Sequence, residues 1–424
     1  MSVATTIYNF FRQNNNLKSI IMLGLLLREV FSFWTGHYDF EVFVRVGYYV
    51  AEGINPYSYL RYVEGISFAP YDVMTSIGYP PFIALLAAFI YMIINRLKLN
   101  RFFYYLLLKQ PMILGDIMLS IMLYKLLMEV KKDHESALKA VKYWLLNPFT
   151  MIISSVWGMI DPLVIALLLL SIYLFYKRNK CYDLLSGIIL GVSTFIKQIS
   201  IIYVPLFFLA RKKPLEYLIT TIAIAILLSI SPFFIFNWSF EGFYLCMKHQ
   251  ALEKLTNSEI FLLPFLKDIQ DHTQVLSVIW IPSLLVTYCL FVKRLSDDLQ
   301  SFIKYSILTT FIFLLTRISV SEQLFEYLLI FVLVYYVISS YKNNYSFYKF
   351  LSALLLVYLI VNNTLLVRFL SPISVEAFQW DIYVNNTPPF DTVRLIIRSL
   401  SLFILYLTCV KLIFFTFGKR STLS

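Results

Sequence analysis

Two carboxylates near the start of the chain offer the clearest chemistry in the sequence. Asp39 and Glu41 stand in the run Tyr38-Asp39-Phe40-Glu41, directly after the first apolar segment. Acidic side chains beside a bilayer are costly to keep and usually have a function. Partial desolvation makes a carboxylate a better proton acceptor, which favours Asp39 as a general base with Glu41 as its companion. An ordinary solvated loop is the alternative interpretation, because this spacing is common.

A lysine inside an apolar run is the second feature. Lys197 interrupts the run 195–201, where a cation must reach the membrane surface, pair with an acid or bind an anion. Basic residues already flank this segment as anchors, so anion binding is favoured for Lys197. Arg28 and Arg317 also lie near predicted outer helix ends, where a plain anchoring role is the alternative.

Other acidic residues have strong structural alternatives. Asp161 follows Trp157-Gly158-Met159-Ile160 and precedes Pro162, a pattern typical of a helix start. As an N-cap it would satisfy free backbone N–H groups, and this role is slightly favoured over chemistry. Asp116, directly after Gly115, has the same ambiguity with a stronger structural reading. Glu322 lies between two apolar runs, where a polar loop is the simplest interpretation.

The sequence contains no histidine pattern for a metal centre. The four histidines are scattered, without the i, i+4 spacing of a helical metal site. The acidic pair Asp39 and Glu41 nevertheless leaves a divalent cation, Mn²⁺ or Mg²⁺, as an open alternative. No other cofactor is indicated.

The composition sets the class of protein. The chain of 424 residues is 59% hydrophobic and only 14% charged, and it contains 38 Phe and 31 Tyr. Its apolar runs recur from residue 17 to residue 417 and are too long for barrel strands. We therefore expect a polytopic, all-α membrane protein. The net charge of +11 is explained by basic turns at the membrane surface, so nucleic acid is not an expected partner.

The charged residues predict a topology. Basic residues gather in four places that the positive-inside rule assigns to the cytoplasm: Arg96, Lys98 and Arg101; Lys177, Arg178 and Lys180; Arg211, Lys212 and Lys213; Lys411, Lys419 and Arg420. Segments 35–80 and 238–275 are acidic and should face outward. No cleavage pattern follows the first apolar run, which is expected to be a retained span.

The apolar runs predict 11 to 14 membrane segments in one domain. A first helix over 17–34 precedes an amphipathic interfacial helix over 41–60 and a second span over 79–95. Short segments at 102–115, 116–129, 143–157, 161–176, 184–196 and 199–209 are interpreted as paired half-length helices, with Asp116, Asp161 and Lys197 at their turns. Longer spans are expected at 214–237, 276–292, 302–318, 323–341, 348–370 and 393–415. Residues 17–240 would form the catalytic module and 276–415 variable C-terminal helices.

Several motifs, in order, carry a family likeness. The segments 38–43, 53–57 and 79–81 resemble the first outer loop of GT-C membrane glycosyltransferases. Asn147-Pro148, the run 157–161, the run 187–197 and Ser321-Glu322-Gln323-Leu324-Phe325 continue the same order. The likeness covers roughly residues 25–335. It is greatest to polyprenol- or dolichol-phosphate-mannose-dependent mannosyltransferases, including the catalytic subunit of GPI mannosyltransferase I and its prokaryotic relatives.

The resemblance implies a reaction and a set of site residues. A hexose, by family mannose, would pass with inversion from a polyprenyl phosphate to an acceptor hydroxyl at the outer membrane face. Catalysis then needs a base for the acceptor and cations for the departing phosphate, but little acid help. The residues implied are, for catalysis, Asp39, Glu41 and Asp161; for the donor phosphate, Lys197, Arg28 and Arg317; and for substrate binding, His37, Tyr57, Tyr79, Gln198, Glu322 and Gln323.

Two rival classes stay open. A transporter or flippase of lipid-linked glycans would be expected to show charges along a central path or repeat symmetry between its halves, and the sequence has neither. A membrane scaffold would have no reason to gather acids in one loop. The expected partners are a lipid-linked sugar donor, a glycan or glycolipid acceptor, membrane lipid and a small membrane subunit. The expected location is the plasma membrane of a prokaryote, such as an archaeon, with an extracytoplasmic active site.

Overall fold

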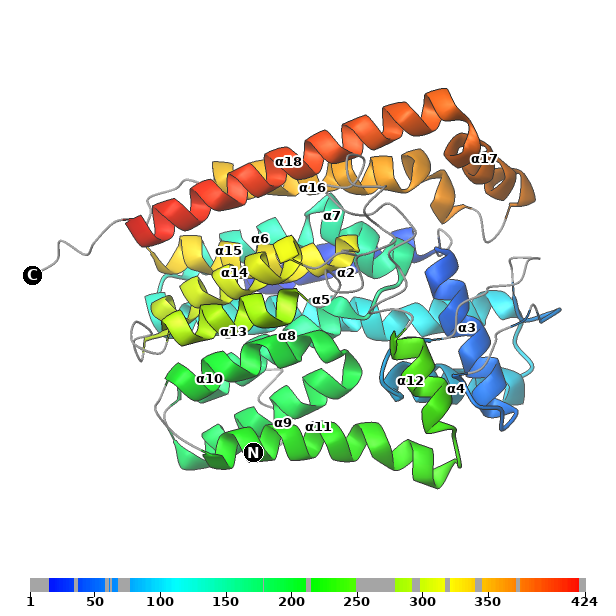
Figure 1. Cartoon of the computed structure of the whole chain (residues 1–424), viewed down its shortest axis with the longest axis horizontal. Coiled ribbons are helices and arrows are strands. Elements are labelled where there is room, and N and C mark those ends of the chain that lie inside the picture. The colour runs from blue at the N-terminus through cyan, green and yellow to red at the C-terminus, as the bar shows by residue number, and fades with distance from the viewer. Residues whose placement is uncertain are drawn as a thin grey trace, which may run out of the picture.

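A computed structural model of the chain describes residues 15–33, 37–57, 61, 63–67, 77–177, 179–210, 215–248, 279–291, 298–316, 321–339, 345–370 and 374–418. These residues are mostly helical and include no strand, which confirms the all-α expectation (Figure 1). The first half contains α2 (Asn15–Ser32), α3 (Tyr38–Ala51), α4 (Phe82–Arg96), α5 (Arg101–Lys131), α6 (His134–Leu145), α7 (Pro148–Met151), the π-helix η1 (Ile152–Trp157), α8 (Asp161–Phe175), α9 (Lys180–Ile196), the 3₁₀ helix η2 (Gln198–Tyr203) and α10 (Val204–Ala210).

The second half is also built from helices. They are α11 (Leu215–Ile235), α12 (Phe240–Lys248), α13 (Trp280–Phe291), α14 (Leu299–Thr316), η7 (Glu322–Leu324), α15 (Phe325–Ile338), α16 (Ser346–Asn362), η8 (Thr364–Phe369), α17 (Val375–Asn386) and α18 (Pro388–Gly418). The long helices run beside one another along the longest axis, whereas α3, α12 and α17 gather at one end (Figure 1). We call this the α3 end.

Some of these helices are long and apolar enough to cross a bilayer. Three of them meet this condition among the described residues: Glu216–Ile235, Leu299–Thr316 and Pro388–Phe414. The pair Pro148–Trp157 and Asp161–Phe175 qualifies as one span bent by 119°. Shorter apolar helices are Phe82–Arg96, Gln198–Ala210, Trp280–Phe291 and Ser346–Asn362. Of these, only Gln198–Ala210 corresponds to a predicted half-length segment (199–209); the other three lie on runs predicted as full-length spans. The total number of crossings stays a prediction.

The segment around Asp116 differs from the expectation. The sequence predicted two short helices, 102–115 and 116–129, but α5 is one continuous helix of 31 residues with Asp116 in its interior. Gly115 has a packing role instead of marking a turn. A Cβ at Gly115 would lie 2.6 Å from the backbone nitrogen of Leu163, so its absence lets α5 and α8 pack backbone to backbone.

The predicted second span is instead part of a hairpin at the α3 end. The Tyr104 hydroxyl of α5 donates to the carbonyl of Val44 in α3 at 3.0 Å and to that of Ala87 in α4 at 3.2 Å. Arg101 donates to the carbonyl of Ser67 at 2.8 Å. The basic turn 96–101 therefore lies on the same side as the acidic segment 35–80.

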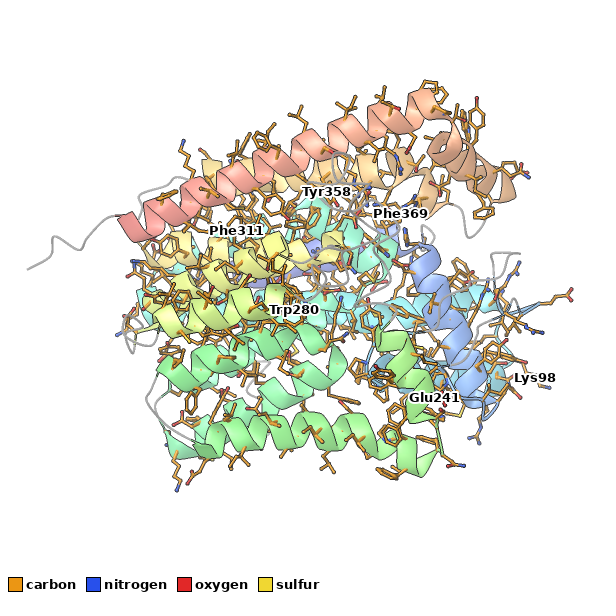
Figure 2. The ribbon with its side chains drawn as sticks, in the orientation of Figure 1. Lys98, Glu241, Trp280, Phe311, Tyr358 and Phe369 are labelled. Atoms are coloured by element: carbon orange, nitrogen blue, oxygen red, sulfur yellow. The ribbon has the colours of Figure 1, made fainter. Side chains whose placement is uncertain are left out.

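This arrangement contradicts the prediction that the turn 96–101 and the cluster 177–180 are both cytoplasmic. Lys177 pairs with Glu129 near the last turn of α5 at 2.7 Å, whereas Arg101 begins the same helix. Because α5 is about 46 Å long, these two basic clusters lie at opposite ends of the molecule. Figure 2 places Lys98 at the α3 end, where Glu241 also lies. The predicted topology is wrong here because the positive-inside rule was applied as if each apolar run crossed the membrane.

Candidate active site

An ion pair buried between two helix breaks forms the centre of the candidate site. The ammonium of Lys197 donates to both carboxylate oxygens of Asp161, at 2.8 and 2.7 Å. Lys197 is 5% exposed and Asp161 is fully buried. A buried pair of this kind is costly to desolvate, so its retention favours a function beyond stability.

Local backbone geometry brings these two side chains together. Lys197 has extended dihedral angles, φ −151° and ψ 125°, between α9 and η2, so its side chain leaves the helix direction. Asp161 opens α8 after a break at Gly158, whose φ is +79°. A Cβ at Gly158 would lie 2.6 Å from the ring of Phe40, which explains the glycine.

The structure assigns Asp161 a different role from the expected N-cap. The cap residue of α8 is Ile160, and no side-chain cap hydrogen bond is present there. The Asp161 carboxylate is instead fully engaged with Lys197, as its two hydrogen bonds show. The expectation that Asp161 and Lys197 stand at helix breaks is confirmed, and the N-cap interpretation is wrong.

Aromatic residues of the first loop cover this ion pair. The Lys197 ammonium lies 5.1 Å from the centre of the Tyr79 ring, a cation–π contact. Tyr57 donates to the Tyr79 carbonyl at 3.1 Å, and its ring stacks on Phe233. Burial raises the pKa of the Tyr57 phenol, so this donor stays protonated. Gln198 donates to the carbonyl of Gly78 at 3.3 Å, which ties the loop to the Lys197 break.

Asp39 stands at the rim of the same region. It lies in the first turn of α3 and its side chain is 40% exposed, so it can reach a substrate. His37 caps this helix: its Nδ1 accepts from the Asp39 backbone N–H at 3.1 Å and lies 3.3 Å from the Asp39 carboxylate. The His37 ring packs 4.6 Å from Trp157, just before the Gly158 break.

Glu41 is buried on the side of α3 that faces α5. It is fully buried, accepts a hydrogen bond from the Tyr105 hydroxyl, and lies 3.7 Å from Arg45 one turn later. Residues two apart on a helix do not face each other, which is why the exposed Asp39 and the buried Glu41 diverge. The structure does not bring these two carboxylates onto one surface.

The donor set therefore does not fit a shared metal ion. Asp39 and Glu41 cannot both ligate one cation from these positions. Within the described ranges, no group of three or more His, Cys, Asp or Glu side chains could hold a metal.

Arg28 occupies a second buried ion pair. Its Nε donates to the Asp116 carboxylate at 2.6 Å, and Nη1 donates to the carbonyl of Leu145 at 2.7 Å. The Trp144 indole donates to the other oxygen of Asp116. These bonds tie α2, α5 and α6 together. Arg317, the other arginine expected at the donor phosphate, lies outside the described residues.

Glu322 and Gln323 are buried rather than placed in a solvated loop. The Glu322 carboxylate accepts from Asn362 and Asn363 at the end of α16. The segment that follows carries Phe369, whose ring lies 5.6 Å from His37. Glu322 thus supports the wall of the site through α16 and η8.

Sequence reasoning missed two buried polar groups beside the site. Glu326 on α15 is fully buried, and its carboxylate makes no hydrogen bond to any described residue. Its electrostatic interactions are with the members of both ion pairs, Asp116 with Arg28 and Asp161 with Lys197. Lys109 on α5 donates to the Ser32 carbonyl at 3.1 Å under the Phe40 ring. The signal that identified Lys197, a charge in an apolar run, is present at both positions.

Comparisons with known proteins place the chain among glycosyltransferases by sequence and among membrane glycosyltransferases by fold. The structure is similar to "Crystal Structure of ArnT from Cupriavidus metallidurans bound to Undecaprenyl phosphate". The TM-score is 0.51 at 11% identity, over 94% of this chain and 77% of that one, a likeness of fold. The model of glycosyltransferase family 87 matches residues 78–361, and the chain belongs to this family. No curated protein matches it. The family match begins after Asp39, so it carries no information about the acidic pair.

Proposed function

We propose that the chain transfers a hexose from a polyprenyl-phosphate-linked donor to a hydroxyl of a glycan or glycolipid acceptor at the outer face of a membrane. The observation that carries the proposal is the buried Lys197–Asp161 pair together with the partly exposed Asp39, whose neighbour His37 packs on Trp157 just before the break that leads to Asp161. The glycosyltransferase family supports the reaction class. The undecaprenyl phosphate bound to the ArnT relative supports a donor of this kind.

The proposed reaction is a single displacement. Asp39 removes the proton from the acceptor hydroxyl while the acceptor oxygen forms a bond to the anomeric carbon. The bond from that carbon to the phosphate oxygen breaks, and polyprenyl phosphate leaves with its electron pair. Because attack and departure occur on opposite faces, the anomeric configuration inverts.

Lys197 would hold the donor phosphate. Its ammonium is held by Asp161 and by the face of Tyr79, so its position is fixed before the donor arrives. Asp161 then acts as a positioning residue for Lys197 rather than as a base. The partly exposed Tyr79 and Gln198 form the adjoining wall on which a sugar can rest, and the buried Tyr57 supports Tyr79 through its hydrogen bond.

Mannose, a dolichol-type carrier and a prokaryotic plasma membrane complete the proposal. Mannose and the dolichol-type carrier rest on the resemblance of the ordered motifs, and the prokaryotic membrane rests on a composition rich in Ile, Tyr and Lys and poor in Gly. The orientation rests on Asp39 and the acidic segment 35–80 lying at one end, with Lys177 and Lys180 at the other.

The test is a transfer assay in isolated membranes that contain the protein. Polyprenyl phosphates carrying radiolabelled mannose, glucose or N-acetylglucosamine are added in turn, and new labelled lipids or glycans are separated. We expect one labelled sugar, mannose, to enter a product only when the protein is present. Transfer from a nucleotide sugar with none from any lipid-linked sugar would contradict the proposal.

A further inference from the structure

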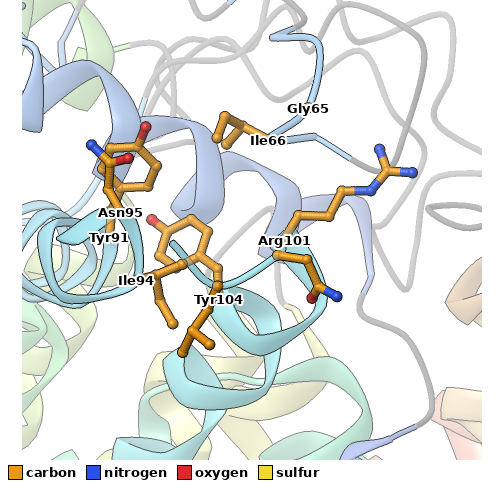
Figure 3. A pocket seen from close by; sticks show the side chains of 9 residues that line it. Gly65, Ile66, Tyr91, Ile94, Asn95, Arg101 and Tyr104 are labelled. Carbon is orange, nitrogen blue, oxygen red and sulfur yellow. The ribbon is translucent and has the colours of Figure 1, made fainter. Parts of the chain in front are cut away.

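A pocket at the α4–α5 turn stands apart from the candidate active site. It has a volume of about 300 Å³ and is lined by Gly65, Ile66, Tyr91, Ile94, Asn95, Leu99, Asn100, Arg101 and Tyr104. Figure 3 shows side chains from α4, from the start of α5 and from segment 65–66 converging around it. Tyr91, Ile94 and Tyr104 are buried and form an aromatic and aliphatic floor, whereas Asn95 and Arg101 lie at the exposed rim.

The rim carries an unusual charge for its side of the molecule. Arg101 lines the pocket, and Arg96 and Lys98 belong to the same turn, at the end of α5 opposite Lys177. Arg96 and Lys98 are exposed, and no described carboxylate lies within ion-pair distance of either. Other arginines at this end, such as Arg368, are paired with acids. Basic residues in short loops normally stay on the cytoplasmic side. With the α3 end outside, as in the proposed function on which this inference rests, an anionic ligand or surface would explain the cluster.

The helix that leads to the turn exposes an apolar stripe. Phe89, Met92 and Ile93 are 58, 51 and 37% exposed, and with Arg96 they follow the i, i+3, i+4, i+7 spacing of one helix face. The opposite face of α4 packs on α3, where Tyr48 and Tyr91 make an edge contact. An exposed apolar stripe that ends in basic residues is typical of a helix lying in the interface of a membrane with anionic lipids.

From these observations we propose that the α4–α5 turn is a binding site for the phosphate-bearing head group of an anionic membrane lipid. The apolar stripe of α4 rests in the acyl boundary. Arg96, Lys98 and Arg101 face the phosphate, and the amide of Asn95 and the Tyr91 hydroxyl bind head-group hydroxyls in the pocket. This site is distinct from Lys197 and needs no sugar transfer.

Thermal unfolding of the full chain in detergent tests this proposal. Dioctanoyl phosphatidylglycerol, dioctanoyl phosphatidylcholine and inorganic phosphate are titrated separately while Tm is followed. We expect phosphatidylglycerol to raise Tm with saturation, and phosphatidylcholine and inorganic phosphate to have little effect. A Tm rise with inorganic phosphate equal to that with phosphatidylglycerol would overturn the lipid assignment in favour of a free phosphate site.

Two double variants with the same charge change locate the site. Arg96→Gln with Lys98→Gln leaves the Arg101–Ser67 hydrogen bond intact. It should lower the affinity for phosphatidylglycerol roughly 30-fold, because each basic residue contributes about 1 kcal/mol to lipid binding. Lys132→Gln with Lys180→Gln changes exposed residues at the other end of α5 and should keep the normal response. If both double variants kept the phosphatidylglycerol-induced rise in Tm, or if both lost it, the proposal would be overturned. Asn95→Leu should weaken the response with all three basic residues present.

Discussion

The ammonium of Lys197 lies 2.8 and 2.7 Å from the two carboxylate oxygens of Asp161, with both side chains removed from water. Neither group is available as an isolated charge. A donor phosphate that binds Lys197 must therefore approach a cation that is already oriented. In the proposed reaction, Asp39 accepts the acceptor proton, Lys197 holds the donor phosphate and Asp161 positions Lys197.

Removing one partner of the Lys197–Asp161 pair should destabilise the protein. Lys197→Met alone leaves a buried, unpaired carboxylate, at a cost of about 3–5 kcal/mol in the free energy of unfolding. The double variant Lys197→Met with Asp161→Leu should recover most of that stability but not donor binding. Thermal unfolding and binding of a labelled lipid-linked sugar are the two measurements. Normal donor binding by the stable double variant would assign the pair to structure alone.

The Arg28–Asp116 pair provides the matched comparison. Arg28→Met should also lower stability by about 3–5 kcal/mol, because Asp116 stays buried without its cation. The double variant Arg28→Met with Asp116→Leu should recover both stability and sugar transfer, since this pair joins α2, α5 and α6 away from the donor. Turnover is measured with donor at saturation and below it. A raised KM for donor in a stable double variant would return Arg28 to the phosphate site.

Glu41 should contribute to stability rather than to chemistry. Tyr105→Phe removes its hydrogen-bond donor and should cost about 1–3 kcal/mol. Glu41→Gln keeps an acceptor for Tyr105, so we expect a smaller loss of stability and turnover within about 5-fold of normal, with no effect of a chelator. Both variants are compared by thermal unfolding and by rate. A large loss of rate at unchanged Tm in Glu41→Gln would place Glu41 in the reaction.

The two basic clusters should be accessible from opposite sides of the membrane. In a background without the four native cysteines, Lys98→Cys and Ser239→Cys should react with a membrane-impermeant maleimide added outside intact cells. Lys180→Cys should react only after the membrane is opened. All three positions are exposed, so a lack of reaction reflects sidedness rather than burial. Labelling of Lys98→Cys and Lys180→Cys from the same side would contradict the α3–α4 hairpin.

The class of fold was predictable because a protein surrounded by lipid needs an apolar composition and long apolar runs. Lipid around the chain requires helices, and most predicted runs correspond to observed helices within a few residues, as 161–176 does to α8. The helix breaks at Asp161 and Lys197 were also predictable. Glycine before an acid and proline, and a lysine in an apolar run, are local signals.

What failed depended on contacts between distant segments. No local pattern indicates that Tyr104 joins α3 and α4, so the run 79–95 alone predicts a crossing. Asp116 looked like a turn residue because its partner, Arg28, is 88 positions away. Asp39 and Glu41 were interpreted as one site, but helical geometry turns one to the rim and the other into the core.

The rate of Asp39→Asn with a defined donor and acceptor tests the central claim most directly. The substitution preserves shape and removes proton acceptance, and Asp39 is exposed enough for folding to survive. General-base catalysis contributes about 10²- to 10⁴-fold, so turnover should fall at least about 100-fold while donor binding and Tm stay normal. Near-normal turnover in a protein that binds donor normally would contradict the account.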